Sequence, residues 1–70
     1  MIDPDAVRAK AVAYQAEDPD VGSITALKLA TVEALVSDPD MDPAVAMGHV
    51  RAVFASRGWE VHHVLRRLTA

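Results

Sequence analysis

Apolar residues recur along this chain at the three- and four-residue spacing of α-helices, and Asp-Pro pairs interrupt the pattern at 3–4, 18–19, 38–39 and 42–43. An aspartate accepts hydrogen bonds from the free N–H groups at a helix start, and a proline at the first helical position already has a helical φ. A residue before proline is pushed away from the helical region, so each pair also ends the preceding helix. The pattern therefore predicts an all-α fold.

The punctuation predicts four short helices, and we expect them to form a compact bundle in which residues 1–70 make a single helical domain. The predicted helices cover residues 4–17, 23–37, 43–56 and 59–68. Ile2 and Val7 flank the first helix start in the arrangement of a hydrophobic staple. Either Asp18 or Ser23 is expected to cap the second helix.

The second helix is the expected centre of the bundle. Its apolar residues cover more than one stripe, which predicts burial on two sides. They are Ile24, Leu27, Leu29, Val32, Leu35 and Val36. The third helix is expected to bury a single face, made of Met47, Val50, Val53 and Phe54. Gly48, in the middle of the third helix, is expected to permit a close helix crossing.

The last two helices are predicted to form a tight αα-hairpin around Arg57-Gly58. The sequence from Phe54 to Trp59 is typical of a Schellman ending, with Gly58 in the left-handed conformation and Trp59 packed back on Phe54. The alternative for Trp59 is a half-exposed position beside arginine, which is the composition of a binding hot spot. The fourth helix carries one apolar stripe for the core: Val61, Val64, Leu65 and Leu68.

Composition limits how such a bundle is stabilised. The chain has 70 residues, no cysteine, and one residue each of Phe, Trp and Tyr. Disulfides and thiolate metal sites are therefore excluded, and a domain this small often gains stability from self-association. No apolar run approaches the roughly 20 residues that cross a bilayer, and the first residues are acidic. We expect a cytoplasmic protein with no membrane partner.

Charge is divided unevenly along the chain. The formal net charge is −3, with nine acidic and three basic residues in 1–50, but four arginines against Glu60 alone in 51–70. Such asymmetry is typical of chains whose two ends meet different partners, although it also occurs without functional meaning.

The candidate catalytic and metal motifs are incomplete. Asp38, Asp40 and Asp42 have the spacing that begins a calcium loop, but the glycine and the final glutamate of such a loop are missing, so helix capping is the better interpretation. His62 and His63 are consecutive and would point about 100° apart on a helix, which prevents both from binding one ion. We expect no metal, no cofactor and no catalytic residues, and the chain is not predicted to be an enzyme.

Two classes of function compete for the basic C-terminal helix. Its candidate partner-binding residues are Arg51, Arg57, Trp59, His62, His63, Arg66 and Arg67. The helix pair has the outline of the helix-turn-helix motif of DNA-binding regulators. Base-reading residues usually lie near the start of a recognition helix, however, where this chain offers Trp59 and Glu60.

The favoured hypothesis is a small intracellular helical module for protein–protein interaction, with homodimerisation as one form of it. It would dock on a partner through an apolar groove or through the basic C-terminal helix. The alternatives are a helix-turn-helix DNA-binding regulator and a structural subunit of a larger assembly, such as a phage component. Salt-sensitive binding to duplex DNA would favour the DNA-binding regulator, and defined oligomers beyond a dimer would favour the structural subunit.

Overall fold

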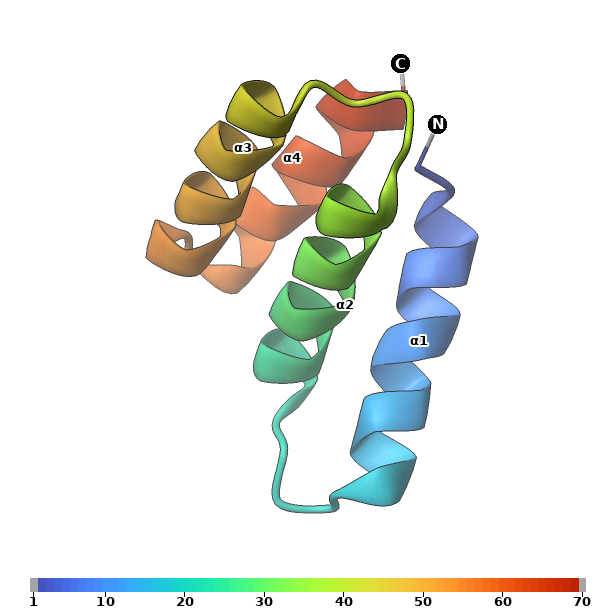
Figure 1. Cartoon of the computed structure of the whole chain (residues 1–70). Coiled ribbons are helices and arrows are strands. Elements are labelled where there is room, and N and C mark those ends of the chain that lie inside the picture. The colour runs from blue at the N-terminus through green and yellow to red at the C-terminus, as the bar shows by residue number, and fades with distance from the viewer. Residues whose placement is uncertain (1, 70) are drawn as a thin grey trace.

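The computed structural model describes residues 2–69, which form α-helices and no strand. The helices are α1 (Pro4–Glu17), α2 (Ser23–Ser37), α3 (Pro43–Ala55) and α4 (Gly58–Thr69). Each helix runs roughly opposite to the one before it, so that α1 begins and α4 ends at the same end of the molecule (Figure 1). The predicted all-α bundle is confirmed. The predicted boundaries differ from the structure by one residue, at the end of α3 and at both ends of α4.

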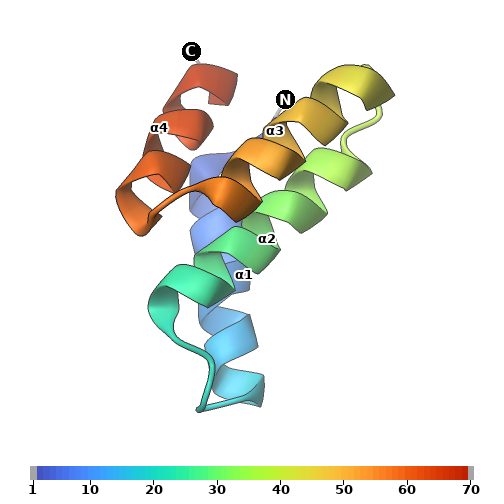
Figure 2. The ribbon, with the colours of Figure 1, turned by 90° about the vertical axis from the view of Figure 1, so that its left-hand side faces the viewer.

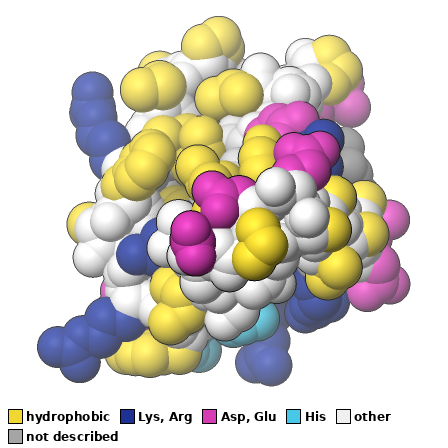
Figure 3. Space-filling model, turned by 90° about the horizontal axis from the view of Figure 1, so that it is seen from below, with side chains coloured by type: hydrophobic (Ala, Val, Ile, Leu, Met, Phe, Trp, Pro, Cys, Tyr) yellow, Lys and Arg dark blue, Asp and Glu magenta, His cyan; other side chains and the backbone are white. Residues whose placement is uncertain are grey.

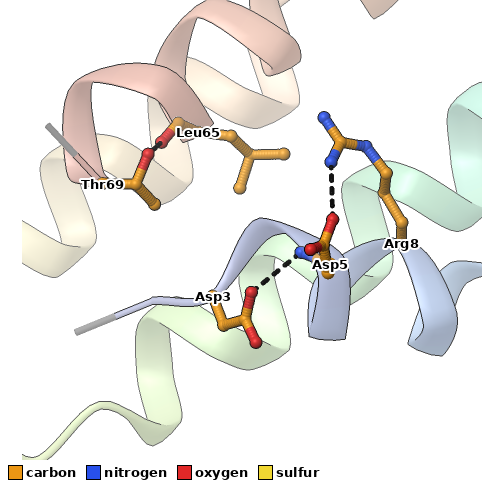
Figure 4. A network of polar contacts seen from close by, with 5 residues as sticks. All are labelled: Asp3, Asp5, Arg8, Leu65 and Thr69. Atoms are coloured by element: carbon orange, nitrogen blue, oxygen red, sulfur yellow. Dashed lines mark hydrogen bonds and ion pairs between the residues drawn. The ribbon is translucent and has the colours of Figure 1, made fainter.

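Aspartate caps hold the starts of α1 and α3, as predicted. The Asp3 carboxylate accepts a hydrogen bond from the N–H of Asp5 at 3.0 Å (Figure 4). The Asp42 carboxylate accepts from the N–H groups of Ala44 and Val45 at 2.8 and 3.4 Å. In both helices a proline follows the cap, where its missing N–H forfeits no hydrogen bond.

The start of α2 lies where predicted, but the expected cap is wrong. Ser23 is the first helical residue, and the N-cap, Gly22, makes no side-chain hydrogen bond. Asp18 instead accepts from the N–H of Asp20 at 3.1 Å, within the loop. Because this Asp-Pro pair lies well before the helix, its carboxylate stabilises a local turn and does not reach the N–H groups of α2.

The centre of the bundle is α2, which contacts each of the other three helices. It runs alongside α3 and crosses in front of α1 in the view of Figure 2. The largest fully buried apolar side chains are Leu35, Val53, Val61 and Leu65. Ile2 and Val7 are also buried in this core, as the hydrophobic staple predicts. The expectation that α2 is central is therefore confirmed.

Several apolar residues that were expected in the core face solvent. Leu29 and Val36 on α2 are exposed, and so are Met47 and Phe54 on α3. The predicted burial is therefore wrong for these four residues, whereas Val50 and Val53 of the predicted α3 face are buried. Three short neighbours cover only part of the circumference of α2, and no helix within residues 2–69 lies over its outer side.

The glycines have different roles from those predicted. A Cβ added at Gly48 would meet no atom within 4 Å among the described residues, so this glycine does not mark a close crossing. The close approach is at Gly58, where a Cβ would lie 3.0 Å from Cγ1 of Ile24. No glycine in the described part of the chain has a positive φ, so the Schellman prediction is wrong and Gly58 is the first residue of α4.

Leu35→Ala should destabilise the fold far more than Leu29→Ala. Leu35 is almost completely buried, whereas Leu29, on the same helix, is 38% exposed. Large-to-small substitution of a buried leucine costs about 2–5 kcal/mol, because transfer energy is lost and a cavity remains. Urea unfolding followed by circular dichroism measures the difference. Equal losses for the two variants would contradict the assignment of α2 as the central helix with one exposed side.

Gly48→Ala should stabilise the protein by about 0.5–1 kcal/mol, because alanine loses less backbone entropy in a helix and the site is open. Gly58→Ala is the matched substitution at a crowded site, where the Ile24 side chain must shift to admit the new methyl group. We expect a smaller gain or a loss there. Thermal unfolding of both variants checks the contrast, which fails if Gly58→Ala stabilises as much as Gly48→Ala.

Candidate protein-interaction surface

The outer face of α4 combines aromatic and basic side chains. At about 100° per residue, Trp59, His62, His63 and Arg66 fall on one side of the helix, away from the buried Val61. All four are exposed. The rings of Trp59 and His63 meet edge to face, with centroids 5.4 Å apart and planes at 84°. We call these four residues the outer face of α4.

A short, well-bonded turn positions this face. The Glu60 carboxylate accepts a hydrogen bond from the N–H of Arg57 at 3.0 Å, which is one half of a capping box. The buried Ser56 hydroxyl donates to the carbonyl of Val53 at 2.7 Å. Only Ser56 and Arg57 separate α3 from α4. The predicted tight hairpin is therefore present, and Trp59 is held on the first turn of α4.

An apolar groove of about 500 Å³ lies where the start of α4 meets α1 and α2. Its lining residues are Arg8, Ala11, Val12, Gln15, Ser23, Ile24, Leu27, Gly58, Trp59 and His62. Three of them, Val12, Ile24 and Trp59, are 64%, 54% and 58% exposed, and each belongs to a different helix. The groove therefore brings together large apolar side chains from three separate parts of the sequence.

The one formally charged residue in the described lining of this groove is basic, whereas the protein as a whole is acidic. Of the described residues that line it, Arg8 carries a positive charge and none is Asp or Glu, whereas the chain has a formal net charge of −3. The second groove, of about 510 Å³ between α1 and the end of α2, includes Asp3, Glu33 and Asp38 in its lining. Figure 3 shows the end of the molecule at the loop between α1 and α2, where exposed hydrophobic side chains are interleaved with basic and acidic ones.

A polar network joins α1 to α2 beside the second groove. The Tyr14 hydroxyl donates to the Glu33 carboxylate at 2.5 Å, and Nζ of Lys10 lies 3.5 Å from the other carboxylate oxygen. This hydrogen bond and, to a lesser degree, Lys10 hold the pKa of Glu33 below its ordinary value. The same hydrogen bond raises the pKa of Tyr14, because the phenol must keep its proton to donate. These contacts fix the register of the two helices that wall the apolar groove.

The structure distributes the predicted partner-binding residues over several places. Trp59 and His62 line the apolar groove, and His63 and Arg66 complete the outer face of α4. The other three predicted residues, Arg51, Arg57 and Arg67, are exposed but do not line the groove. No ion pair within residues 2–69 involves any of the four arginines after residue 50.

Trp59 does not cover a buried Phe54, so the predicted lid is wrong. Phe54 is 62% exposed, nearly the same as Trp59, and the ring partner of Trp59 among the described residues is His63. The physical reason is that Gly58 continues directly into α4 with a negative φ, which directs the chain away from Phe54. The exposed position beside basic residues is the alternative that the structure supports.

Val12 and Ile24 are groove residues that sequence reasoning missed. The buried residues of α1 are Val7 and Ala11, four residues apart on one face, and Val12 falls outside that face. A valine outside the buried face was the signal in the sequence that could have identified Val12 as a groove residue. Ile24 had no comparable signal, because its apolar neighbours on α2 made burial the natural prediction.

Other classes of site find no support in the described residues. Within residues 2–69, no group of three or more His, Asp or Glu side chains is placed to hold a metal ion. None of the helices in the described part of the chain is both long and apolar enough to cross a membrane. Comparison with protein-family models, curated proteins and solved structures gives no match to this chain.

Tyr14→Phe should raise the pKa of Glu33 toward its ordinary value of 4.5, because the largest stabilising contact of the carboxylate is removed. Lys10→Gln should raise it less. Since the folded pKa lies below the unfolded one, ionised Glu33 stabilises the fold above the unfolded pKa, and this contribution is lost as pH falls through the folded pKa. Carbon NMR titration of the Glu33 carboxyl measures both shifts. An unchanged titration in Tyr14→Phe would contradict the hydrogen bond.

Proposed function

We propose that this chain is a helical protein–protein interaction module that docks a protein partner in the apolar groove between α1, α2 and the start of α4. The observation that supports the proposal is the convergence of Val12, Ile24 and Trp59, each more than half exposed, around one hollow. Single exposed apolar residues are normal, but a cluster with tryptophan and arginine has the composition of interface hot spots.

Apolar burial, and not ion pairing, is expected to supply most of the affinity. Fully burying a large aliphatic or aromatic side chain contributes about 1.5–3 kcal/mol, whereas an exposed ion pair contributes about 0–1 kcal/mol. Because each of these side chains is already partly buried in the free protein, it contributes less than the figure for full burial. The three anchor side chains together are still expected to contribute more binding free energy than the exposed charges around the groove. Trp59 is the residue with the most apolar surface to bury, and it is the expected centre of the interface.

Peptides selected from a random display library against the purified protein should depend on Trp59. Trp59→Ala should weaken their binding by at least about tenfold, as expected for a hot-spot residue. Phe54→Ala is the matched control, because Phe54 is an equally exposed aromatic outside the groove. Fluorescence anisotropy of labelled peptides measures the affinities. The proposal fails if no peptide is selected, or if both variants weaken binding equally.

DNA binding is the second candidate, favoured by one observation. Arg66 and Arg67 are exposed in the last turns of α4 without an ion pair in the described residues. The start of α4, where a recognition helix reads bases, instead carries Trp59 and the capping Glu60, whose charge repels phosphate. A mixed-sequence duplex tests this: salt-sensitive binding that is lost on replacing both arginines with glutamate would replace the interaction proposal.

Self-association remains the third candidate, supported by the exposed Leu29 and Val36 on the outer side of α2. Sedimentation velocity over a range of protein concentrations separates it from docking of a different protein. A stable species larger than a dimer would favour a structural subunit.

A further inference from the structure

We infer that the partner segment for this groove is an amphipathic α-helix that carries acidic residues beside its apolar stripe. The inference rests on the proposed function and names the chemistry of the partner. It follows from the kind of backbone around the groove and from the charges on its rim.

The backbone around the groove favours a helical occupant. Every described lining residue belongs to α1, α2 or α4, so most backbone N–H and C=O groups there are already bonded within a helix. No strand edge exists within residues 2–69 for a partner strand to extend. Recognition must therefore use side chains, and the mode that does so in a groove between helices is insertion of the apolar face of another helix.

The shape of the groove suits a stripe of apolar side chains. Besides the exposed anchors Val12, Ile24 and Trp59, its lining contains a small residue from each of the three helices: Ala11, Ser23 and Gly58. Gly58 in particular has no side chain and stands directly against Ile24. A partner helix with apolar residues at i, i+3 or i+4 and i+7 can place them between these anchors.

The charges at the groove favour acidic residues on the partner. Arg8 lines it without an accompanying Asp or Glu among the described lining residues, and Arg66 lies one turn beyond the lining residue His62 on the same face of α4. Arg8 does pair with Asp5 at 3.3 Å, but both side chains are at least half exposed. An exposed pair of this kind contributes about 0–1 kcal/mol, so a carboxylate of the partner can replace it.

The helix dipoles also favour acidic residues on the partner. Both α2 and α4 begin in the lining of the groove, at Ser23 and Gly58. The N-terminal end of a helix carries partial positive charge, and the N-cap of α2, Gly22, makes no side-chain hydrogen bond. The charged side chains are the main attraction, and these two helix starts add to it. The one formal charge in the described lining is thus that of Arg8, on a protein whose net charge is negative.

Three designed helical peptides with an identical leucine stripe test the inference, with flanking residues that are all Glu, all Gln or all Lys. We expect the Glu peptide to bind at least about tenfold more tightly than the Lys peptide at about 20 mM salt. The difference should shrink at about 200 mM salt, because exposed charges are screened. Fluorescence anisotropy of labelled peptides gives the dissociation constants, and circular dichroism confirms that the three peptides are equally helical.

A matched pair of variants places the effect at the groove. Arg8→Gln removes a charge from the lining and should weaken binding of the Glu peptide several-fold at low salt. Arg51→Gln removes the charge of another exposed arginine, which belongs to α3 and lies outside the lining. This variant should leave binding nearly unchanged. Equal effects of the two substitutions would overturn the assignment of the charge preference to this groove.

The remaining outcomes separate this inference from the proposed function. Equal binding of the three peptides, or tighter binding of the Lys peptide, would overturn the acidic partner. If none of them binds while library peptides still depend on Trp59, the inference fails and the interaction module stands. If the library peptides also fail to bind, both the inference and the proposed function are contradicted. A dimer of the protein itself that Trp59→Ala dissociates would identify a second copy as the occupant and overturn the inference.

Discussion

The packing of α2 against its three neighbours is the interaction on which the rest of this structure depends. With no cysteine for a disulfide and a single residue of each aromatic type, the chain must be held together by aliphatic contacts to one central helix. Leu35 on α2 and Leu65 on α4 are both almost completely buried. The completely buried hydroxyl of Thr31 donates to the carbonyl of Leu27 at 2.7 Å, so it enters the core without an unsatisfied polar atom.

The same constraint explains why large apolar side chains remain outside. A chain of this size buries only about 60% of the surface of its unfolded form, so four short helices cannot enclose every apolar residue that they carry. The surplus lies on the outer side of α2, on the exposed face of α3 and at the groove beside α4. At the groove, three helices contribute one exposed anchor each, and Gly58 lets the start of α4 approach Ile24 closely. Part of the incompletely buried apolar surface thus lies in a concave site.

Charge and apolar surface together distinguish this groove from the rest of the molecule. The acidic residues of the chain lie mainly at helix starts and in loops, where carboxylates such as those of Asp3 and Asp42 accept hydrogen bonds from N–H groups. The outer face of α4, in contrast, contains no acidic residue and carries histidine and arginine. Arg8, in the lining of the groove, pairs with Asp5 in an exposed contact of 3.3 Å.

The sequence by itself determined the position of every helix to within one residue, because caps, prolines and apolar periodicity act over only a few neighbouring residues. It also singled out Trp59, His62 and Arg66 as candidates for partner binding, since exposed basic and aromatic residues on a short final helix are visible in the sequence pattern. The function of these residues remains a prediction.

The tertiary structure alone decided which apolar residues are buried and which of them meet. Leu29 and Leu35 are chemically identical, and only the placement of the neighbouring helices leaves one exposed and the other in the core. The close approach of Gly58 to Ile24 is likewise a contact between residues far apart in the sequence, which no local rule contains. Val12 and Trp59 lie far apart in the sequence, and they share a groove because three helices cross there.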